Sequence, residues 1–294
     1  MIYKHSDLIK TLTQVIVPEG VSEIASGVFQ NCEMLSDISL PDTLNRIGEG
    51  AFSRCLRLRH IDIPASVTKI ADETFAGCTC LESVNFSENL EIIGSAAFNF
   101  CSNLQNVKLP NSLTEIGERA FEGCKNLTDI VLPPQISVLP SFAFAQCSKL
   151  NNIILSENLS EIGEFSFLGC SAVESIGIPD SVSEIGREAF KGCTGLKHIR
   201  IPTNISVIKS KTFALCSSLR EIVLPELLTS IEAGAFMDCA ELENIFIPAS
   251  VTNIAVNAFL GCTRLKTVSV ADKKGIAPEI FACHPGVNIV YRNK

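Results

Sequence analysis

The sequence contains no tryptophan, two tyrosines (Tyr3 and Tyr291) and only four histidines among its 294 residues. Carbohydrate sites usually stack sugar rings on exposed Trp or Tyr side chains, so a glycan ligand is disfavoured. The histidines are scattered: His60 and His198 share one column of the repeat described below, but they lie six repeats apart, about 29 Å at the spacing of neighbouring strands. They cannot act on one substrate atom. We therefore expect neither an enzyme nor a cofactor.

An excess of basic residues and long apolar runs are missing as well. Lys and Arg number 24 against 32 Asp and Glu, which gives a formal net charge of −8. This balance disfavours nucleic acid and acidic membrane surfaces as partners, because both are bound through basic patches. No run reaches the length of a membrane span, and the first ten residues lack the apolar stretch of a signal peptide. We predict no membrane insertion and a cytoplasmic location for the chain as written. The alternative is the cell surface or secretion, through a signal already removed or a non-standard export route.

What the sequence does contain is a strict repeat. A phenylalanine, followed three residues later by a cysteine, recurs at intervals of 23 residues without a slip. The pairs are Phe29/Cys32, Phe52/Cys55, Phe75/Cys78, Phe98/Cys101, Phe121/Cys124, Phe144/Cys147, Phe167/Cys170, Phe190/Cys193, Phe213/Cys216, Phe236/Cys239 and Phe259/Cys262. A fixed period of this length predicts a solenoid, in which each repeat buries its apolar edge on its neighbours.

The apolar residues of each repeat predict what lies inside the solenoid. Leu113, Ile116, Leu127, Ile130 and Leu132 each belong to a column that stays apolar from repeat to repeat. The last three form the pattern L-x-x-I-x-L, in which a spacing of two indicates a strand, and proline commonly follows it. We expect the A-F-x-x-C segment on the opposite side, with Phe filling the gap between coils and Cys a small buried filler. Glycine follows the Ile column in five repeats, which indicates special backbone dihedrals or a close approach of coils (Gly48, Gly94, Gly117, Gly163, Gly186).

The combination of A-F-x-x-C with L-x-x-I-x-L-P in a 23-residue unit resembles the BspA-like leucine-rich repeats, also called the Treponema pallidum type. The resemblance covers about nine-tenths of the chain. It implies an α/β-type repeat solenoid that is curved, with a parallel β-sheet on its concave face and little regular helix. It also implies surface or secreted proteins that bind other proteins or adhere to cells. No catalytic residues are known for the repeat itself, so none are carried over.

The chain is predicted to be one domain, residues 1–294, because a solenoid grows by adding repeats to one core. The repeats run from 12 to 270. Residues 1–11 carry no repeat and predict an N-terminal cap, with Ser6 or Asp7 as a candidate helix N-cap. Residues 271–294 predict a C-terminal cap: Asp272 to Gly275 reads as a polar turn, and Val287, Ile289 and Tyr291 alternate like a closing edge strand.

The thirteen cysteines could be free thiols, disulfide partners or metal ligands. Eleven of them stand in the one repeat column, where neighbouring coils bring them close enough for disulfides. A buried column with an odd number of members nevertheless favours reduced thiols. Cys78 and Cys80 could form half of a metal site, but no second pair of Cys or His has matching spacing, so no metal is expected. Cys283 beside His284 is an equally weak indication.

The variable positions of the predicted strands are the candidates for function. The central outward column on the concave face is polar at Ser39, Asp62, Asn85 and Lys108 and then carries Val131, Ile154, Arg200, Val223 and Phe246. An exposed apolar patch with an arginine is typical of a protein-binding hot spot, although β-branched residues on a sheet can also serve strand formation alone. The flanking outward column supplies a polar rim of Asp129, Asn152, Ser175, His198, Glu221 and Asn244.

We interpret the chain as a non-catalytic scaffold that binds a protein or peptide along the concave face. The alternative is a surface adhesin-like module that binds host matrix or glycan, and a third possibility is a purely structural spacer. The sequence does not identify the ligand or the oligomeric state.

Overall fold

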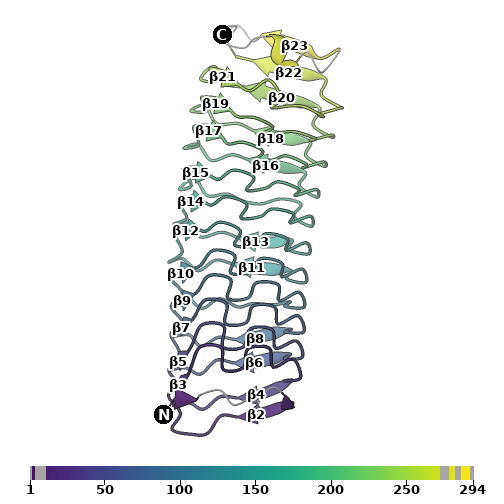
Figure 1. Ribbon diagram of the computed structural model, residues 1–294. Helices are drawn as coiled ribbons and strands as arrows, with labels where there is room; N and C mark the ends of the chain where they lie inside the picture. The colour runs from purple at the N-terminus through teal and green to yellow at the C-terminus, as the bar shows by residue number, and fades with distance from the viewer. Residues whose placement is uncertain (1, 4–10, 272–277, 282–285, 292–294) are drawn as a thin grey trace. The chain divides into compact units, whose positions relative to one another are not determined.

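A computed structural model of the chain describes residues 2–3, 11–271, 278–281 and 286–291 (Figure 1). Its contacts divide the chain into two compact units, the first comprising residues 1–136 and 140–156 and the second residues 137–139 and 157–294. Each unit is a stack of 23-residue coils, and the described residues form a parallel β-solenoid of about twelve coils. Most of the predicted N-terminal cap, the polar turn at 272–275, Cys283 and His284 lie outside the described residues. The single-domain organisation stays a prediction.

In each unit the predicted strands form parallel pairs between neighbouring coils, and we call this set of strands the first ladder. In unit 1 it contains β2 (Gln14–Ile16), β4 (Asp37–Ser39), β6 (His60–Asp62), β8 (Ser83–Asn85), β11 (Asp129–Val131) and β13 (Asn152–Ile154). In unit 2 it contains β16 (His198–Arg200), β18 (Glu221–Val223), β20 (Asn244–Ile247), β22 (Thr267–Val270) and the closing strand β23 (Asn288–Tyr291). Residues 23 apart are paired, as Ile130 with Ile153. The central side chain of each three-residue strand points inward and its neighbours point outward, as predicted.

A second ladder, which the sequence pattern did not indicate, is made of strands only two residues long. In unit 1 it runs β1 (Ile2–Tyr3), β3 (Glu23–Ile24), β5 (Arg46–Ile47), β7 (Lys69–Ile70), β9 (Ile92–Ile93) and β10 (Glu115–Ile116). In unit 2 it contains β12 (Val138–Leu139), β14 (Glu161–Ile162) and β15 (Glu184–Ile185), and then β17 (Val207–Ile208), β19 (Ser230–Ile231) and β21 (Asn253–Ile254). The described part contains a short 3₁₀ helix at Pro278–Phe281 (η2) and no α-helix. The expected α/β label is therefore corrected to all-β for the described residues, since their turns contain no α-helix.

The phenylalanine column forms the centre of the core. In unit 1 the rings from Phe29 to Phe144 stack nearly parallel, with centroids 5.1–5.5 Å apart, and they are fully buried. In unit 2 the rings from Phe167 to Phe259 stack in the same way at 5.3–5.7 Å. Each ring is a flat spacer between two coils, so the column both fills the interior and sets the spacing of the repeat.

The cysteine column lies beside the rings as buried free thiols. The Cys124 S–H donates a hydrogen bond to the Phe98 carbonyl at 3.2 Å, and the same contact between neighbouring coils recurs along both units. Burial raises the pKa of the Cys193 thiol to about 12, which keeps it protonated and able to donate. The column is thus a second set of hydrogen bonds between coils.

The turns on the A-F-x-x-C side contain two left-handed residues in most coils. One column precedes Cys and includes Arg54, Phe100, Leu215 and Gly123, all with φ between 56° and 74°. Glycine after the Ile column plays a different part: Gly48 has no positive φ, and a Cβ there would lie 2.5 Å from the Ser26 backbone nitrogen. Of the two explanations offered by the sequence, close approach of coils is confirmed at Gly48.

In the part of the chain that the structure describes, no helix has the length and apolar character needed to cross a membrane.

Candidate functional site

The outward side chains of the first ladder form a surface that we call the long-strand face. Its central column reads Ile16, Ser39, Asp62, Asn85, Lys108, Val131 and Ile154 in unit 1, and Gly177, Arg200, Val223, Phe246 and Ser269 in unit 2. All are exposed except Phe246 and Ser269, which are half-buried. The polar rim residues Asp129, Asn152, Ser175, His198, Glu221 and Asn244 are exposed too. The ten predicted site residues lie five in each outward column, and nine of them are exposed, the exception being Phe246.

In unit 1 the predicted residues come together as a compact group. Val131 and Ile154 are paired in register on β11 and β13 and remain 51% and 53% exposed. The Asn152 amide donates to the Asp129 carboxylate at 3.0 Å, so the polar rim beside them is held by its own contact. Hydrogen bonds from Thr128 and Asn152 lower the pKa of Asp129 and keep it ionised. The group is therefore an apolar pair with a fixed anionic border.

A hollow of 390 Å³ adjoins this pair in unit 1. It is lined by Asn106, Val107, Lys108, Leu109, Asn111, Asp129, Ile130 and Val131. Here the first ladder is reduced to one bridging residue, because Asn106 alone pairs with Ser83 and Asp129. Within the described residues, Lys108 at the edge of the hollow forms no ion pair. The hollow therefore offers an apolar floor and a cation that a ligand can neutralise.

In unit 2 the predicted Arg200 is already engaged. Its guanidinium donates two hydrogen bonds of 3.0 Å to the Asp180 carboxylate, and the Thr203 amide donates to the same carboxylate at 3.2 Å. The Arg200 hydrogen bond is the main cause that lowers the pKa of Asp180. Val223 pairs with Arg200 across the strands and is 51% exposed. The arginine is thus fixed in one orientation beside an exposed valine.

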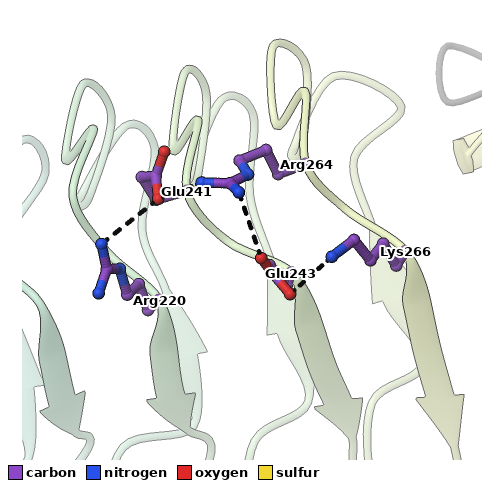
Figure 2. A network of polar contacts seen from close by, with 5 residues as sticks. All are labelled: Arg220, Glu241, Glu243, Arg264 and Lys266. Carbon is purple, nitrogen blue, oxygen red and sulfur yellow. Dashed lines mark hydrogen bonds and ion pairs between the residues drawn. The ribbon is translucent and has the colours of Figure 1, made fainter.

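A network of ion pairs borders the predicted Asn244 at the start of the unit 2 strands. Figure 2 shows that Glu241 and Glu243 lie among Arg220, Arg264 and Lys266 on neighbouring coils. The short contacts are Arg264 to Glu241 at 2.6 Å and Lys266 to Glu243 at 2.9 Å. Hydrogen bonds from Arg264 and Lys266 lower the pKa values of Glu241 and Glu243, respectively.

These five side chains, three cations and two anions, link three neighbouring coils through exposed ion pairs and leave one positive charge in excess. The network was missed in the sequence. The available signal was the alternation of charge at intervals of 23 residues, as in Arg220, Glu243 and Lys266.

Another exposed residue was overlooked at the first strand. Ile16, in the same central column as Val131 and Ile154, is 80% exposed. The described residues contain no group of three His, Cys, Asp or Glu side chains placed to hold a metal ion.

Comparison with known proteins identifies the repeat. The family described as BspA type leucine rich repeat region matches in six copies, over residues 8–101, 68–197 and 184–288. A leucine-rich repeat protein from Bacteroides ovatus is 26% identical, with a TM-score of 0.60, over 95% of this chain and 92% of that one. The T. pallidum leucine-rich repeat protein is 30% identical, with a TM-score of 0.53, over 66% of this chain and 82% of that one.

A leucine-rich cell-surface protein from Faecalibacterium prausnitzii is 23% identical, with a TM-score of 0.52, over 97% of this chain and 89% of that one, and this likeness concerns the fold alone. A search of curated proteins gave no match. The family match spans nearly all the coils, and the buried Phe and Cys columns that define the repeat form the core of both units. The chain belongs to the BspA-type leucine-rich-repeat family.

Proposed function

We propose that this protein is a non-catalytic scaffold that binds a protein or peptide on its long-strand face, and that the main contact lies in unit 1. The single observation that carries the proposal is the exposed, in-register pair Val131 and Ile154 beside the 390 Å³ hollow. Solvated sheet faces are normally polar, and contiguous apolar side chains next to a depression are characteristic of protein-binding surfaces.

The chemistry around the pair favours a particular ligand. Lys108 and Asp129 both line the hollow: Lys108 forms no ion pair in the described residues, and Asp129 accepts hydrogen bonds from Thr128 and Asn152. A segment with apolar side chains over Val131 and Ile154 and an acidic side chain toward Lys108 would complement this surface. Such a segment would neutralise the lysine without disturbing the bonded rim.

Unit 2 supplies the remaining proposed contacts by itself. Arg200 is held by Asp180 and lies next to Val223, so it presents a rigid guanidinium and an apolar side chain together. Aromatic and arginine side chains are frequent hot spots, and an arginine that is already oriented loses less entropy on binding. Phe246, His198, Glu221 and Asn244 belong to this second proposed surface as contributors around the arginine.

Affinity capture from native-source lysate and from surface-exposed fractions tests the proposal with three baits. They are the wild type, the double variant Val131→Asp with Ile154→Asp, and the control Ile16→Asp. Ile16 is 80% exposed in the same column of the same unit, so its substitution adds one of the two charges of the double variant to the same kind of position. We expect a ligand that is retained by the wild type and the Ile16 variant and bound at least tenfold less by the double variant.

Equal capture by the double variant, or equal loss with the Ile16 variant, would contradict the site. Thermal unfolding of all three baits should be nearly the same, because the substituted side chains are exposed. If none of the three baits recovers a specific protein from any fraction, this result would contradict a protein ligand and favour the adhesin-like alternative.

The adhesin-like alternative, which binds host matrix or glycan, has one observation in its favour. The Faecalibacterium relative is described as a cell-surface protein. Protease treatment of intact native cells, followed by detection of the chain, separates this setting from the cytoplasmic location expected from the sequence. Cleavage in intact cells would place the chain at the surface, and protection until lysis would place it inside.

A further inference from the structure

Four polar side chains from β6 and β8 of unit 1 meet on the long-strand face, one coil before the hollow of the proposed ligand site. Register pairs His60 with Ser83 and Asp62 with Asn85. His60 Nε2 lies 2.9 Å from Asp62 Oδ1, and Asn85 Nδ2 lies 2.7 Å from the same oxygen. The Asn85 amide nitrogen is 3.5 Å from His60 Nε2, and His60 Nδ1 contacts Ser83 Oγ at 2.9 Å.

Three of these atoms form a triangle of the size that one metal ion can cap. A transition-metal ion with bonds of about 2.0–2.2 Å to nitrogen and oxygen holds neighbouring ligand atoms about 2.9–3.5 Å apart. Two sides of the triangle of His60, Asp62 and Asn85 measure 2.9 and 3.5 Å and lie in this range, and the third, the 2.7 Å hydrogen bond from Asn85 to Asp62, has to lengthen slightly. The two ends of a side-chain amide are exchanged by a simple rotation, which places the Asn85 oxygen where its nitrogen lies. The ligand set then becomes one imidazole nitrogen, one carboxylate oxygen and one amide oxygen.

We propose that His60, Asp62 and Asn85 bind a divalent transition-metal ion such as Zn²⁺ or Ni²⁺, with water in the remaining positions. Imidazole and carboxylate ligands suit these ions.

Ser83 completes the arrangement as a positioning residue. A metal-bound histidine usually donates its other ring N–H to a nearby acceptor, which fixes the tautomer and the ring orientation. With Nε2 on the metal, His60 Nδ1–H donates to Ser83 Oγ, the contact that already exists at 2.9 Å. Metal binding requires a tautomer change of His60 and an amide rotation of Asn85, and it exchanges the hydrogen bonds from these two side chains to Asp62 for bonds to the ion.

The exposure of the cluster suits ion binding better than nucleophilic catalysis. Ser83, His60 and Asp62 are linked in the order of a nucleophile, a base and a carboxylate, but the His60 and Asp62 side chains are 46% and 74% exposed. Water at this surface screens the charges that such a reaction develops, whereas a partly hydrated metal ion tolerates solvent.

The chain provides a matched control in unit 2. His198 occupies the same column as His60, but Arg200 stands two residues later where Asp62 follows His60. An arginine repels a cation, so the same histidine in the same ladder should bind no metal there.

Isothermal titration calorimetry of the full chain, stripped with chelator and kept reduced, tests the proposal with Zn²⁺ as the probe. The wild type and the His198→Ala control should bind one ion with equal affinity at this site. His60→Ala and Asp62→Asn should each weaken binding more than tenfold, and Ser83→Ala should weaken it about tenfold. Absence of saturable binding to the wild type, or equal weakening by His198→Ala, would overturn the assignment.

Co²⁺ provides a second readout that does not depend on affinity. Nitrogen and oxygen ligands give weak visible bands, whereas thiolate ligands add a strong near-ultraviolet charge-transfer band. We expect the first spectrum, lost in His60→Ala. A thiolate band that disappears in Cys80→Ser would assign the metal to a cysteine and refute the His60 site.

Discussion

The phenylalanine stack makes a quantitative prediction about where stability resides. Phe121 is fully buried and stacks on Phe98 at 5.4 Å and on Phe144 at 5.5 Å, with interplanar angles of 5° and 7°. Replacement of Phe121 by Ala removes a whole ring between two coils and leaves a cavity that the flanking rings cannot fill without breaking the 23-residue register. A fully buried Phe→Ala substitution costs about 3–5 kcal/mol. We expect that loss in unit 1.

Amide hydrogen exchange under native conditions measures this loss coil by coil. The Phe98 N–H donates to the Ala120 carbonyl at 2.8 Å, so its exchange reports opening of the coils on either side of the cavity. Since each 1.4 kcal/mol is tenfold in an equilibrium constant, the expected loss accelerates exchange by about 100- to 4,000-fold. In a repeat protein, stability is a sum of repeat and nearest-neighbour terms, so the Phe213 N–H in unit 2, bonded to Ala235 at 2.9 Å, should be unaffected.

The control is Phe100→Ala. Phe100 is 53% exposed, and its ring lies against the turn at Gly123 instead of between coils. Its removal should change stability by only about 0.5 kcal/mol. Acceleration below tenfold at Phe98 in the Phe121 variant would refute the idea that the stack holds the coils. Equal acceleration at Phe98 and Phe213 would refute local stability and indicate that the solenoid opens as a whole.

Two further predictions concern titratable groups. Of the twelve cysteines in the described residues, only the half-buried Cys80 should react with a disulfide reagent in the native state at pH 8. Burial raises the pKa of Cys193 to about 12, which leaves about one thiolate in ten thousand at this pH. Peptide mapping that finds the buried column cysteines modified before unfolding would contradict this prediction. Asp180→Asn should lower the melting temperature at pH 7, since the Arg200 hydrogen bond lowers the pKa of Asp180 in the folded state and thus stabilises it above the unfolded pKa. That contribution is lost as pH falls through the folded pKa, so the difference from wild type should shrink below about pH 4; a difference that stays constant with pH would count against it.

The period and the core could be predicted from the sequence because the same residue type recurs wherever burial requires it. Ile130 and Leu132 lie inside the first ladder, Phe121 lies between coils and Cys124 is a buried thiol, as expected. The second ladder could not be predicted. A strand such as Glu115–Ile116 has one inward residue, and a period of two cannot be recognised in two positions.

The left-handed turns escaped prediction for a different reason. A positive φ is normally signalled by Gly or Asn, but in this chain Arg54, Phe100 and Leu215 adopt it too. These residues are held by the backbone bonds of the neighbouring coils, as in the donation from the Phe100 N–H to Glu122 at 2.7 Å. The neighbouring coil therefore imposes a positive φ that these residue types do not favour by themselves. The sequence of a single repeat does not indicate this conformation.

For the candidate site, the sequence predicted which side chains point outward from the strands, but it did not predict the contacts that these side chains make. Alternation along each strand correctly placed Val131 and Ile154 in solvent, since it depends only on the period of two. It did not reveal that Asp180 holds Arg200, because that partner lies in the turn of the preceding coil, 20 residues away. It also gave full exposure to Phe246, which is half-buried.

His60 and His198 show why neighbours decide function in this fold. Both are exposed histidines at the start of a first-ladder strand, and the repeat gives them equivalent backbone positions. The residue two places later is Asp62 in one case and Arg200 in the other, and the strand paired with His60 supplies Ser83 and Asn85. One histidine thereby lies beside a carboxylate, a hydroxyl and an amide, and the other lies two residues before an arginine held in an ion pair. Because the core columns are constant, the chemistry of each surface position depends on a few residues from two adjacent coils. A search for function in such a solenoid should therefore compare pairs of adjacent coils instead of single repeats.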